Sequence, residues 1–312
     1  MKTLSDLGEF GLIQRIKKSI KTDSSVVKGS GDDCAVLKLD AKSYALATSD
    51  LLVEGVDFTH KDDPYLIGRK AIAVSLSDIA ACAGIPRYCL VSLGAPPATK
   101  VAFTDRLLKG MRDIAKNYRL NIVGGDLSRA RQLVIDVSIF GAVEKKNLVL
   151  RSGARCGDII FVSGALGGSI RGKHFKFTPR LKEARFLAQN FKLNSMIDIS
   201  DGLAQDLNHL LRESRVGALI YEELIPVDKA AAGLCDALYS GEDFELLFTL
   251  PLEEARRLKK GDVSIFSKIE TKKNRNVPFF PIGEIRDRSC GLRLIDRKNR
   301  EKILKPAGFR HF

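Results

Sequence analysis

The sequence has no tryptophan, few histidines, and cysteines that form neither a Cys-x-x-Cys pair nor a regular pattern. The cysteines are Cys34, Cys82, Cys89, Cys156, Cys235 and Cys290, and the histidines are His60, His174, His209 and His311. Scattered cysteines indicate neither a zinc knuckle nor a disulfide framework, and separated histidines offer no cluster for a soft metal. We therefore expect a protein of a reducing compartment.

The sequence also lacks a hydrophobic run long enough to cross a membrane, because Asp78 interrupts the longest candidate. Its start, MKTLSDLGEFGLIQ, carries acids within the first ten positions and no apolar stretch of signal-peptide length. These absences predict a cytoplasmic protein without membrane association.

The formal net charge of +13 raises the question of nucleic-acid binding. The basic residues are spread along the chain, however, and few aromatic residues lie among them. The favoured interpretation is a solvated basic surface that faces polyanionic ligands, and nucleic acid is not an expected partner. The densest basic run, KKNRN at 272–276, predicts an exposed loop.

With 312 residues and 45% hydrophobic content, the chain is long enough for two domains with sizeable cores. Apolar periodicity predicts helices at 9–20, 66–84, 103–118, 180–190 and 203–213. Strands are predicted at 43–50, ending in Ser49 and Asp50, and at 133–143, 158–164 and 244–250. A strand from residue 120 is predicted to end in a double-glycine turn before Asp126. We place a boundary near Leu148, which gives α/β domains at 1–148 and 149–312.

Seven aspartates follow a predicted strand or glycine turn, or lie inside the apolar helix 66–84: Asp32, Asp33, Asp50, Asp78, Asp126, Asp198 and Asp201. Each has a structural explanation when taken alone. Asp50 would close a turn, Asp201 or Ser200 would cap a helix, and Asp78 would begin one. Together, however, so many carboxylates on buried backbone are costly unless a hard cation gathers them. Carboxylates suit Mg²⁺, which usually bridges to phosphates, so the acids predict a nucleotide site.

The glycine turns GSGDD, GGD and SGALGGS would present backbone N–H groups to phosphate oxygens. None is followed by the Lys-Ser/Thr of a P-loop, and each alone is also typical of an ordinary strand-turn-helix connection. They support the nucleotide interpretation only in combination with the acids.

A series of short motifs runs nearly the whole length of the chain. They are GEFGLI at 8–13, GSGDDCAV at 29–36, TSDLLVEGVDF at 48–58, SLSDIAACAG at 75–84, GGDLSRA at 124–130, RSGARCGD at 151–158, VSGALGGS at 162–169, FTPRL at 177–181, IDISDGLAQDL at 197–207, SGEDFELLFT at 240–249 and the end GFRHF. In order and spacing the chain resembles the thiamine-monophosphate kinase family, within the aminoimidazole-ribonucleotide-synthetase-like ATP-binding superfamily. The resemblance implies a two-domain α/β (α+β) fold in which the N-terminal domains of two subunits pair as a homodimer, with ATP bound near their interface.

The resemblance also implies roles for individual residues. Several Mg²⁺ ions would be held by Asp33, Thr48, Ser49, Asp50, Asp78, Asp126, Asp198 and Asp201. ATP would meet Gly125, Asp126, Arg151 and Ser200, and the thiamine substrate would meet Asp57, Glu242 and Phe309. Glu242 is also compatible with a plain turn residue, and Phe309 with a packed C-terminal aromatic. We predict that Asp33 contacts metal and that Asp32 supports the turn or binds through water.

Two motifs depart from the family pattern. Asp57 stands in VEGVDF where the family commonly has His, and Leu127 and Ala130 stand in GGDLSRA where GGDTTRG is usual. An acid in place of a cation beside a phosphate is unfavourable unless a metal or a lysine compensates. We therefore expect Asp57 to affect substrate affinity more than ATP binding.

The implied reaction moves the γ-phosphoryl group of ATP onto thiamine monophosphate and gives thiamine diphosphate. The nucleophile is a phosphate oxygen with a second pKa of about 6, so no catalytic base or covalent intermediate is expected. Two other hypotheses stay open at this point. One is a ligase or synthetase of the same superfamily, and the other is a non-catalytic protein that binds nucleotide.

Overall fold

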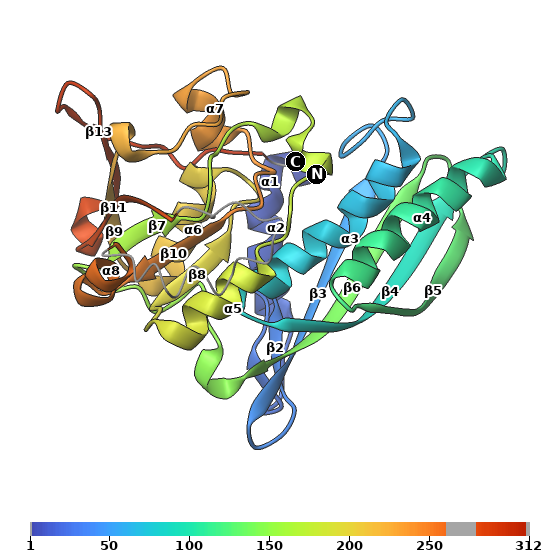
Figure 1. Ribbon diagram of the computed structural model, residues 1–312, viewed down its shortest axis with the longest axis horizontal. Coiled ribbons are helices and arrows are strands. Elements are labelled where there is room, and N and C mark those ends of the chain that lie inside the picture. Colours follow the sequence, from blue (N-terminus) through green and yellow to red (C-terminus); the bar gives the residue numbers. More distant parts are fainter. Residues whose placement is uncertain (1, 260–278, 310–312) are drawn as a thin grey trace.

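The computed structural model describes residues 2–259 and 279–309, which form two β-sheets, one in each half of the chain (Figure 1). The basic run predicted as a loop at 272–276 lies outside these residues. The mixed α/β class is confirmed. The domain boundary near Leu148 stays a prediction.

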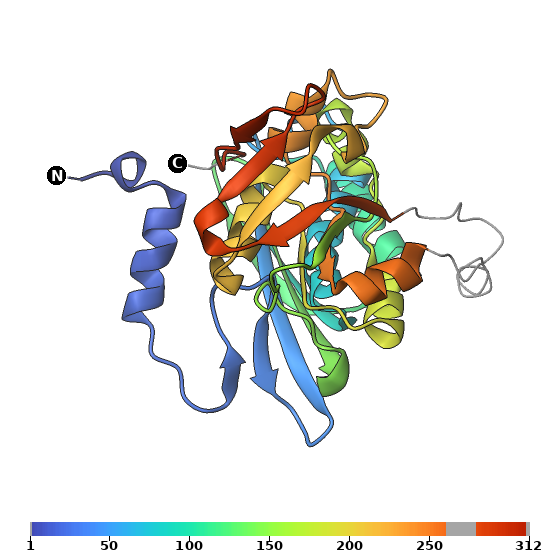
Figure 2. The same ribbon diagram turned by 90° about the vertical axis from the view of Figure 1, so that its left-hand side faces the viewer.

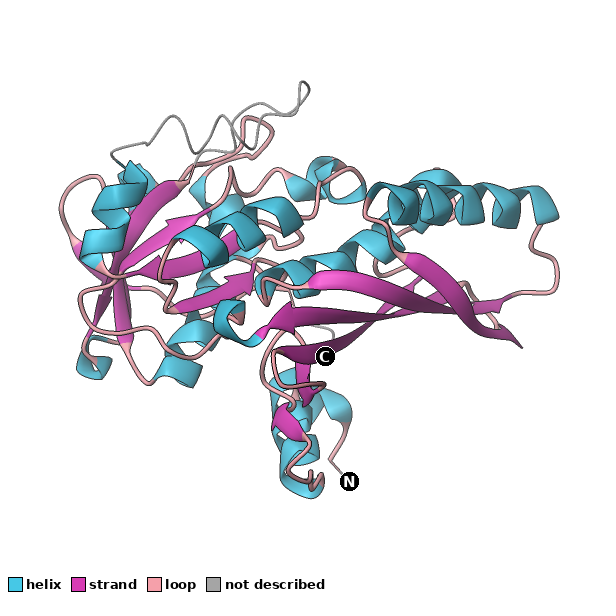
Figure 3. Ribbon diagram, turned by 60° about the horizontal axis from the view of Figure 1, so that its bottom comes forward, coloured by secondary structure: helices cyan, strands magenta, loops and turns pink. Residues whose placement is uncertain are grey.

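The first sheet has six strands in the order β1-β2-β3-β6-β4-β5. They are β1 (Val26–Lys28), β2 (Ala35–Lys38), β3 (Ser43–Val53), β4 (Ile85–Ala95), β5 (Asn121–Arg129) and β6 (Val134–Glu144). Neighbours are antiparallel except β4 and β5, which run parallel. Helices α3 (Pro64–Ala81) and α4 (Val101–Asn117) lie over one face, as Figure 3 shows. On the opposite face, apolar side chains such as Leu51, Tyr88 and Phe140 are exposed.

The second sheet has seven strands in the order β13-β12-β9-β11-β7-β10-β8. They are β7 (Ile159–Val162), β8 (Ser195–Asp198), β9 (Gly217–Tyr221), β10 (Leu246–Leu250), β11 (Phe280–Arg286), β12 (Leu292–Ile295) and β13 (Glu301–Ile303). The helices of this half are α5 (Leu181–Asn190), α6 (Leu203–Ser214), α7 (Leu234–Tyr239) and α8 (Leu252–Lys259). One core lies between this sheet and α6 and α7, and the other joins the opposite face of this sheet to α3 and the first sheet.

Helix α3 connects the two halves of the molecule. Asp63 caps its start by accepting a hydrogen bond from the Tyr65 N–H, and Pro64 occupies the first turn, where a missing N–H costs nothing. The helix is apolar on all sides and most of its residues are buried, because it contacts both β3 and β6 on one side and α5 and β8 on the other. It can approach α4 closely because Gly68 faces the Leu107 carbonyl, where a Cβ would lie 2.0 Å from the oxygen.

Two short N-terminal helices, α1 (Leu4–Leu7) and α2 (Glu9–Ser19), lie at one side of the molecule (Figure 2). Neither contains a buried residue. Helix α2 contacts the rest of the chain through the Phe10 and His209 rings, 4.9 Å apart, and through a 3.7 Å ion pair of Lys17 with Glu213.

Several predicted element boundaries are wrong. Strand β3 does not end at Asp50 but continues to Val53, because each of its residues to the end pairs with β6. The predicted double-glycine turn is absent, since Gly124 and Gly125 lie within β5 and pair with β4. Asp78 lies near the end of α3, and no side chain caps the start of α6 at Gly202. Within residues 2–259 and 279–309, no helix is both long and apolar enough to span a bilayer.

Candidate active site

A cavity of about 390 Å³ lies between the two halves of the chain and is closed on one side by α2. It is lined by Glu9, Phe10, Ile13, Gln14, Lys17, Ser30, Gly31, Asp32, Asp33, Thr48, Ser49, Asp50, Asp78, Arg151, Ser200, Asp201, Asp206, His209, Arg212 and Glu213. Eight of the predicted metal and ATP residues are therefore in one cavity, although they come from separate parts of the chain.

Asp33 and Arg151 form the central ion pair of this cavity. Arg151 donates from Nη2 to Asp33 Oδ1 at 2.6 Å and from Nε to the same oxygen at 3.2 Å. The other oxygen, Asp33 Oδ2, is buried and has no hydrogen-bond partner among the described residues. Asp32 instead accepts the backbone N–H of Arg151 and lies 3.7 Å from Lys28 Nζ. The two adjacent aspartates thus differ in their contacts. Asp32 accepts a hydrogen bond from the backbone of Arg151, and one oxygen of Asp33 has no hydrogen-bond partner among the described residues.

Three further aspartates lie beside Asp33. Oxygens of Asp33, Asp78 and Asp198 lie within 4.8 Å of one another, a separation at which one cation can contact all three. Hydroxyl groups orient these carboxylates: Thr48 donates to Asp78, Ser77 donates to Asp198 at 2.6 Å, and Ser75 donates to Asp50 at 2.6 Å. Because α3 supplies Ser75, Ser77 and Asp78, one rigid helix fixes most of the group.

Burial and mutual repulsion shift the pKa values of these acids upward. Burial, with the negative charge of neighbouring aspartates, raises the pKa of Asp32 to about 7, of Asp50 to about 6 and of Asp198 to about 8. The pKa of Asp78 is raised well above its ordinary value for the same reasons. Without a cation, the cavity therefore takes up protons to relieve its negative charge. A hard divalent cation would contact the Asp33 oxygen that has no hydrogen-bond partner among the described residues, and it would reduce the repulsion among the carboxylates. The residues therefore fit such a cation.

The turn after β8 carries Ser200 and Asp201 into the cavity. It is fixed by Asp206, whose Oδ2 accepts the backbone N–H groups of Asp201 at 2.9 Å and Gly202 at 3.1 Å. Gly202 has φ of 118°, a conformation that favours glycine. Sequence reasoning missed Asp206, but its place in the first turn of a predicted helix, where N–H groups lack partners, was an available signal.

Other predicted residues do not join the acidic group. The Ser49 hydroxyl contacts Asp136 and Ser138 at 2.9 Å, because alternate residues of β3 point to opposite faces of the sheet. Gly125 and Asp126 lie on the edge strand β5: Leu51, Asp136, Ser92 and Asp126 form one row across four strands. Asp126 is thus on the face opposite Asp50, and within one chain it lies apart from the cavity.

Two of the predicted substrate residues, Asp57 and Glu242, lie together at Lys70, and the third, Phe309, lies near the cavity. The Asp57 carboxylate accepts the Val53 N–H at 2.7 Å, and its charge contributes to the raised pKa of Asp50 after burial and the closer aspartate charges. Glu242 contacts Lys70 and lies 3.2 Å from His174 Nδ1. Phe309 lies near the cavity, with its N–H donating to the Asp201 carbonyl.

The sequence and structure were compared with known proteins. The family models described as "AIR synthase related protein" match residues 31–143 for the N-terminal domain and 145–261 for the C-terminal domain. The thiamine-monophosphate kinase of Buchnera aphidicola (subsp. Schizaphis graminum) is 35% identical over 98% of this chain and 99% of its own length. That of Bacillus subtilis is 33% identical over 98% of this chain and all of its own length.

Solved structures of other proteins share the fold of this chain. The structure described as "AaThiL complexed with AMPPCP and TMP" has a TM-score of 0.84 and 30% identity, covering 100% of this chain and 99% of that one. Hydrogenase maturation protein HypE in complex with ATP shares the fold at 17% identity, over 94% of this chain and 93% of that one, with a TM-score of 0.69. From the curated relatives above 30% identity, the chain belongs to the thiamine-monophosphate kinase family.

Proposed function

We propose that the protein transfers the γ-phosphoryl group of ATP directly to the phosphate of thiamine monophosphate, as a cytoplasmic enzyme of thiamine diphosphate biosynthesis. The observation that carries this proposal is the convergence of the Asp33, Asp78 and Asp198 carboxylates beside a cavity that Asp33, Asp78 and Arg151 line. Its support is a relative of the same fold that was solved with AMPPCP and TMP.

Mg²⁺ is the cofactor that this group of acids fits. Asp33, Asp50, Asp78, Asp198 and Asp201 would hold several ions, with Thr48 supplying a hydroxyl oxygen and Ser49 a backbone contact. When bound, Mg²⁺ would neutralise phosphate charge and orient the reacting groups. Arg151 would bind a phosphate oxygen of ATP through the N–H groups that do not bind Asp33, and Ser200 would add a donor.

The chain's own residues have mainly a positioning role in this reaction. Burial lowers the pKa of His209 and of His174 to about 4, so both imidazoles are neutral near pH 7. Neither is needed as a base, because the acceptor phosphate is already largely ionised at that pH. Aligning two polyanions is then the main task of the site.

A homodimer would explain the position of Gly125 and Asp126. Three strand spacings, or roughly 14 Å, separate Asp126 from β3, and it faces away from Asp50. Strand β5 is an exposed edge strand, and its sheet exposes apolar side chains on one face. If these faces pair, Gly125 and Asp126 of one subunit would complete the nucleotide site of the other.

The direct test is to incubate the purified protein with ATP, Mg²⁺ and thiamine monophosphate and to quantify thiamine diphosphate. We expect product from the monophosphate, none from free thiamine, and none after treatment with EDTA. ATP binding without product from the monophosphate would contradict the proposed acceptor.

Metal binding should have a pH-dependent effect on stability. The pKa values of Asp50 and Asp198, about 6 and about 8, exceed the ordinary value of about 3.9. The folded state therefore binds more protons, and this stabilisation, complete below about pH 4, is lost as pH rises through about 6 to 8. We expect the melting temperature of the metal-free protein to fall over that range and Mg²⁺ to raise it more at about pH 8.5 than at about pH 5. Differential scanning fluorimetry would measure both; an equal effect at the two pH values would exclude these acids as the metal site.

A further inference from the structure

Lys70 is a fully buried lysine whose ammonium group lies on the substrate side of the site. The residue is 1% exposed and lies on α3, two turns before Asp78. Its Nζ is 2.9 Å from the Asp57 carbonyl oxygen, 2.9 Å from His174 Nδ1, and in contact with Glu242 Oε1. Burying an ammonium group costs free energy unless its N–H donors are satisfied, and each of the three N–H groups of Lys70 has an acceptor here.

His174 adds no positive charge to this group. Burial and the charge of Lys70 lower the pKa of His174 to about 4, so its imidazole is neutral near pH 7. Because an ammonium only donates, Nδ1 of His174 accepts and its proton is on Nε2. Lys70 and Glu242 then form an ion pair across the two halves of the chain, assisted by a neutral imidazole.

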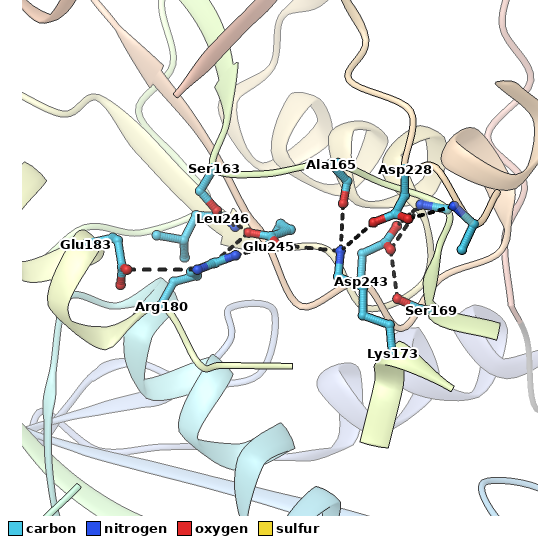
Figure 4. A network of polar contacts seen from close by, with 12 residues as sticks. Ser163, Ala165, Ser169, Lys173, Arg180, Glu183, Asp228, Asp243, Glu245 and Leu246 are labelled. Atoms are coloured by element: carbon cyan, nitrogen blue, oxygen red, sulfur yellow. Dashed lines mark hydrogen bonds and ion pairs between the residues drawn. The ribbon is translucent and has the colours of Figure 1, made fainter. Parts of the chain in front are cut away.

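The backbone at Glu242 is held in an uncommon conformation. Glu242 has φ of 55° and Phe244 has φ of 51°, both in the left-handed region that non-glycine residues rarely adopt. The polar network in Figure 4 anchors the intervening and following residues. Asp243 accepts N–H of Gly167 at 2.9 Å, and Glu245 accepts Nε and Nη2 of Arg180 at 2.7 Å. These contacts hold the backbone at Glu242 in an unfavourable conformation in which its side chain reaches Lys70. The Glu242 side chain is 31% exposed.

The same ammonium fixes the turn that carries Asp57. Its contact with the Asp57 carbonyl holds the turn from one side, while the Asp57 carboxylate holds it from the other by accepting the Val53 N–H. Asp57 influences Asp50 in the nucleotide cavity and His174 beside Lys70. This turn therefore lies between the acidic group and the Lys70–Glu242 pair.

We propose that Lys70 is a positioning residue for the phosphate acceptor: it holds the Glu242 carboxylate and the Asp57 turn across the two halves of the chain, and so determines acceptor binding and not ATP binding. This proposal rests on the proposed function and names the acceptor side of the same site. Lys70 binds the backbone carbonyl of Asp57, the residue that departs from the family pattern. The acceptor it would suit is an organic phosphate with a cationic ring, because the Glu242 carboxylate beside Lys70 is 31% exposed.

The test compares Lys70→Met, Lys70→Gln, Glu242→Gln and the Lys70→Met/Glu242→Gln double variant. Losing a hydrogen bond to a charged group costs about 1.5–3 kcal/mol, so the KM for thiamine monophosphate should rise about 10- to 150-fold in Lys70→Met, with the KM for ATP within about twofold. The double variant should be no worse than Glu242→Gln, because the two residues act through each other. If Lys70→Met does not fold, Lys70→Gln, which keeps N–H donors without the charge, takes its place.

The matched control is Arg185→Met, which breaks another ion pair between the two halves, that of Arg185 with Glu144 at 3.2 Å. It should lower the melting temperature without raising the KM for thiamine monophosphate. The proposal would be overturned if Lys70→Met raised the KM values for ATP and thiamine monophosphate equally, or if Arg185→Met raised the KM for thiamine monophosphate. It would also be overturned if the double variant raised this KM by the product of the two single effects. If the wild-type protein is inactive, the result contradicts the proposed function and not the role of Lys70. Calorimetric titration with thiamine monophosphate would then test Lys70 directly. Equal affinity of the wild type and Lys70→Met would overturn its role.

Discussion

Replacing Asp33 with asparagine is expected to lower turnover by roughly 10²- to 10³-fold, because a metal ligand that neutralises phosphate charge is worth several kcal/mol in the transition state. The substitution is nearly isosteric. It removes the one carboxylate in the cavity that is paired with Arg151 and also has a buried oxygen without a hydrogen-bond partner among the described residues. The measurement is the rate of thiamine diphosphate formation at saturating ATP and Mg²⁺.

The same variant should not unfold. Asp33 raises the pKa values of Asp32 and Asp198 after burial does, so its charge opposes folding in the metal-free state even as it pairs with Arg151. Because these two effects oppose each other, we expect the melting temperature of the metal-free protein to change by about 2–4 °C or less, the shift that roughly 1 kcal/mol produces in a domain of 150 to 250 residues. Asp40→Asn, in an exposed turn, is the matched control and should keep full activity. Near-normal turnover in Asp33→Asn would remove Asp33 from the metal site.

Two inactive variants should restore each other's activity when their subunits are mixed. If Asp126 completes the site of the partner subunit, Asp33→Asn and Asp126→Asn are both inactive as homodimers. A mixed dimer then has one site with both substitutions and one site with neither. Random exchange in a symmetric dimer makes half of the dimers mixed, each with one intact site, so about one quarter of wild-type activity should return.

The experiment requires subunit exchange, for example by refolding or co-expressing the two variants, and the assay of product formation. Mixing Asp33→Asn with Asp78→Asn is the matched control. Both residues lie in the same cavity of one chain, so a mixed dimer would have one doubly substituted and one intact site only if the two acids came from different subunits. Recovery in the control mixture, or no recovery with Asp126→Asn, would contradict a site shared in this way.

The acidic group was largely predictable from the sequence. Aspartates that follow strands or lie in an apolar helix have few ways to remain charged, and the structure brings Asp33, Asp78 and Asp198 within 4.8 Å. The buried helix at 66–84 was predicted because its own residues are apolar on nearly every face. Local composition was sufficient for these members of the group, but the same argument included Asp126, which lies apart from them.

The positions of Ser49, Gly125 and Asp126 could not be predicted in the same way. The two glycines indicated a turn, yet pairing with β4 keeps them in an extended strand. The face on which Asp126 lies depends on register across four strands, which is a property of tertiary pairing and not of the local sequence. Lys70 had a visible signal, a lysine within an apolar helix, but its partner Glu242 lies 172 residues away.

Helix α3 carries both Lys70, which we propose positions the acceptor, and Asp78, which we propose binds Mg²⁺. Lys70 and Asp78 are eight residues apart, which corresponds to about 12 Å along the axis at about 1.5 Å per residue. Because this helix is buried between the two sheets and cannot stretch, it would set a fixed distance between the part of the acceptor bound near Lys70 and the phosphate bound near Asp78. The enzyme would therefore discriminate among acceptors by molecular length, and a homologue of thiamine monophosphate with a longer or shorter side arm would place its phosphate out of line with ATP.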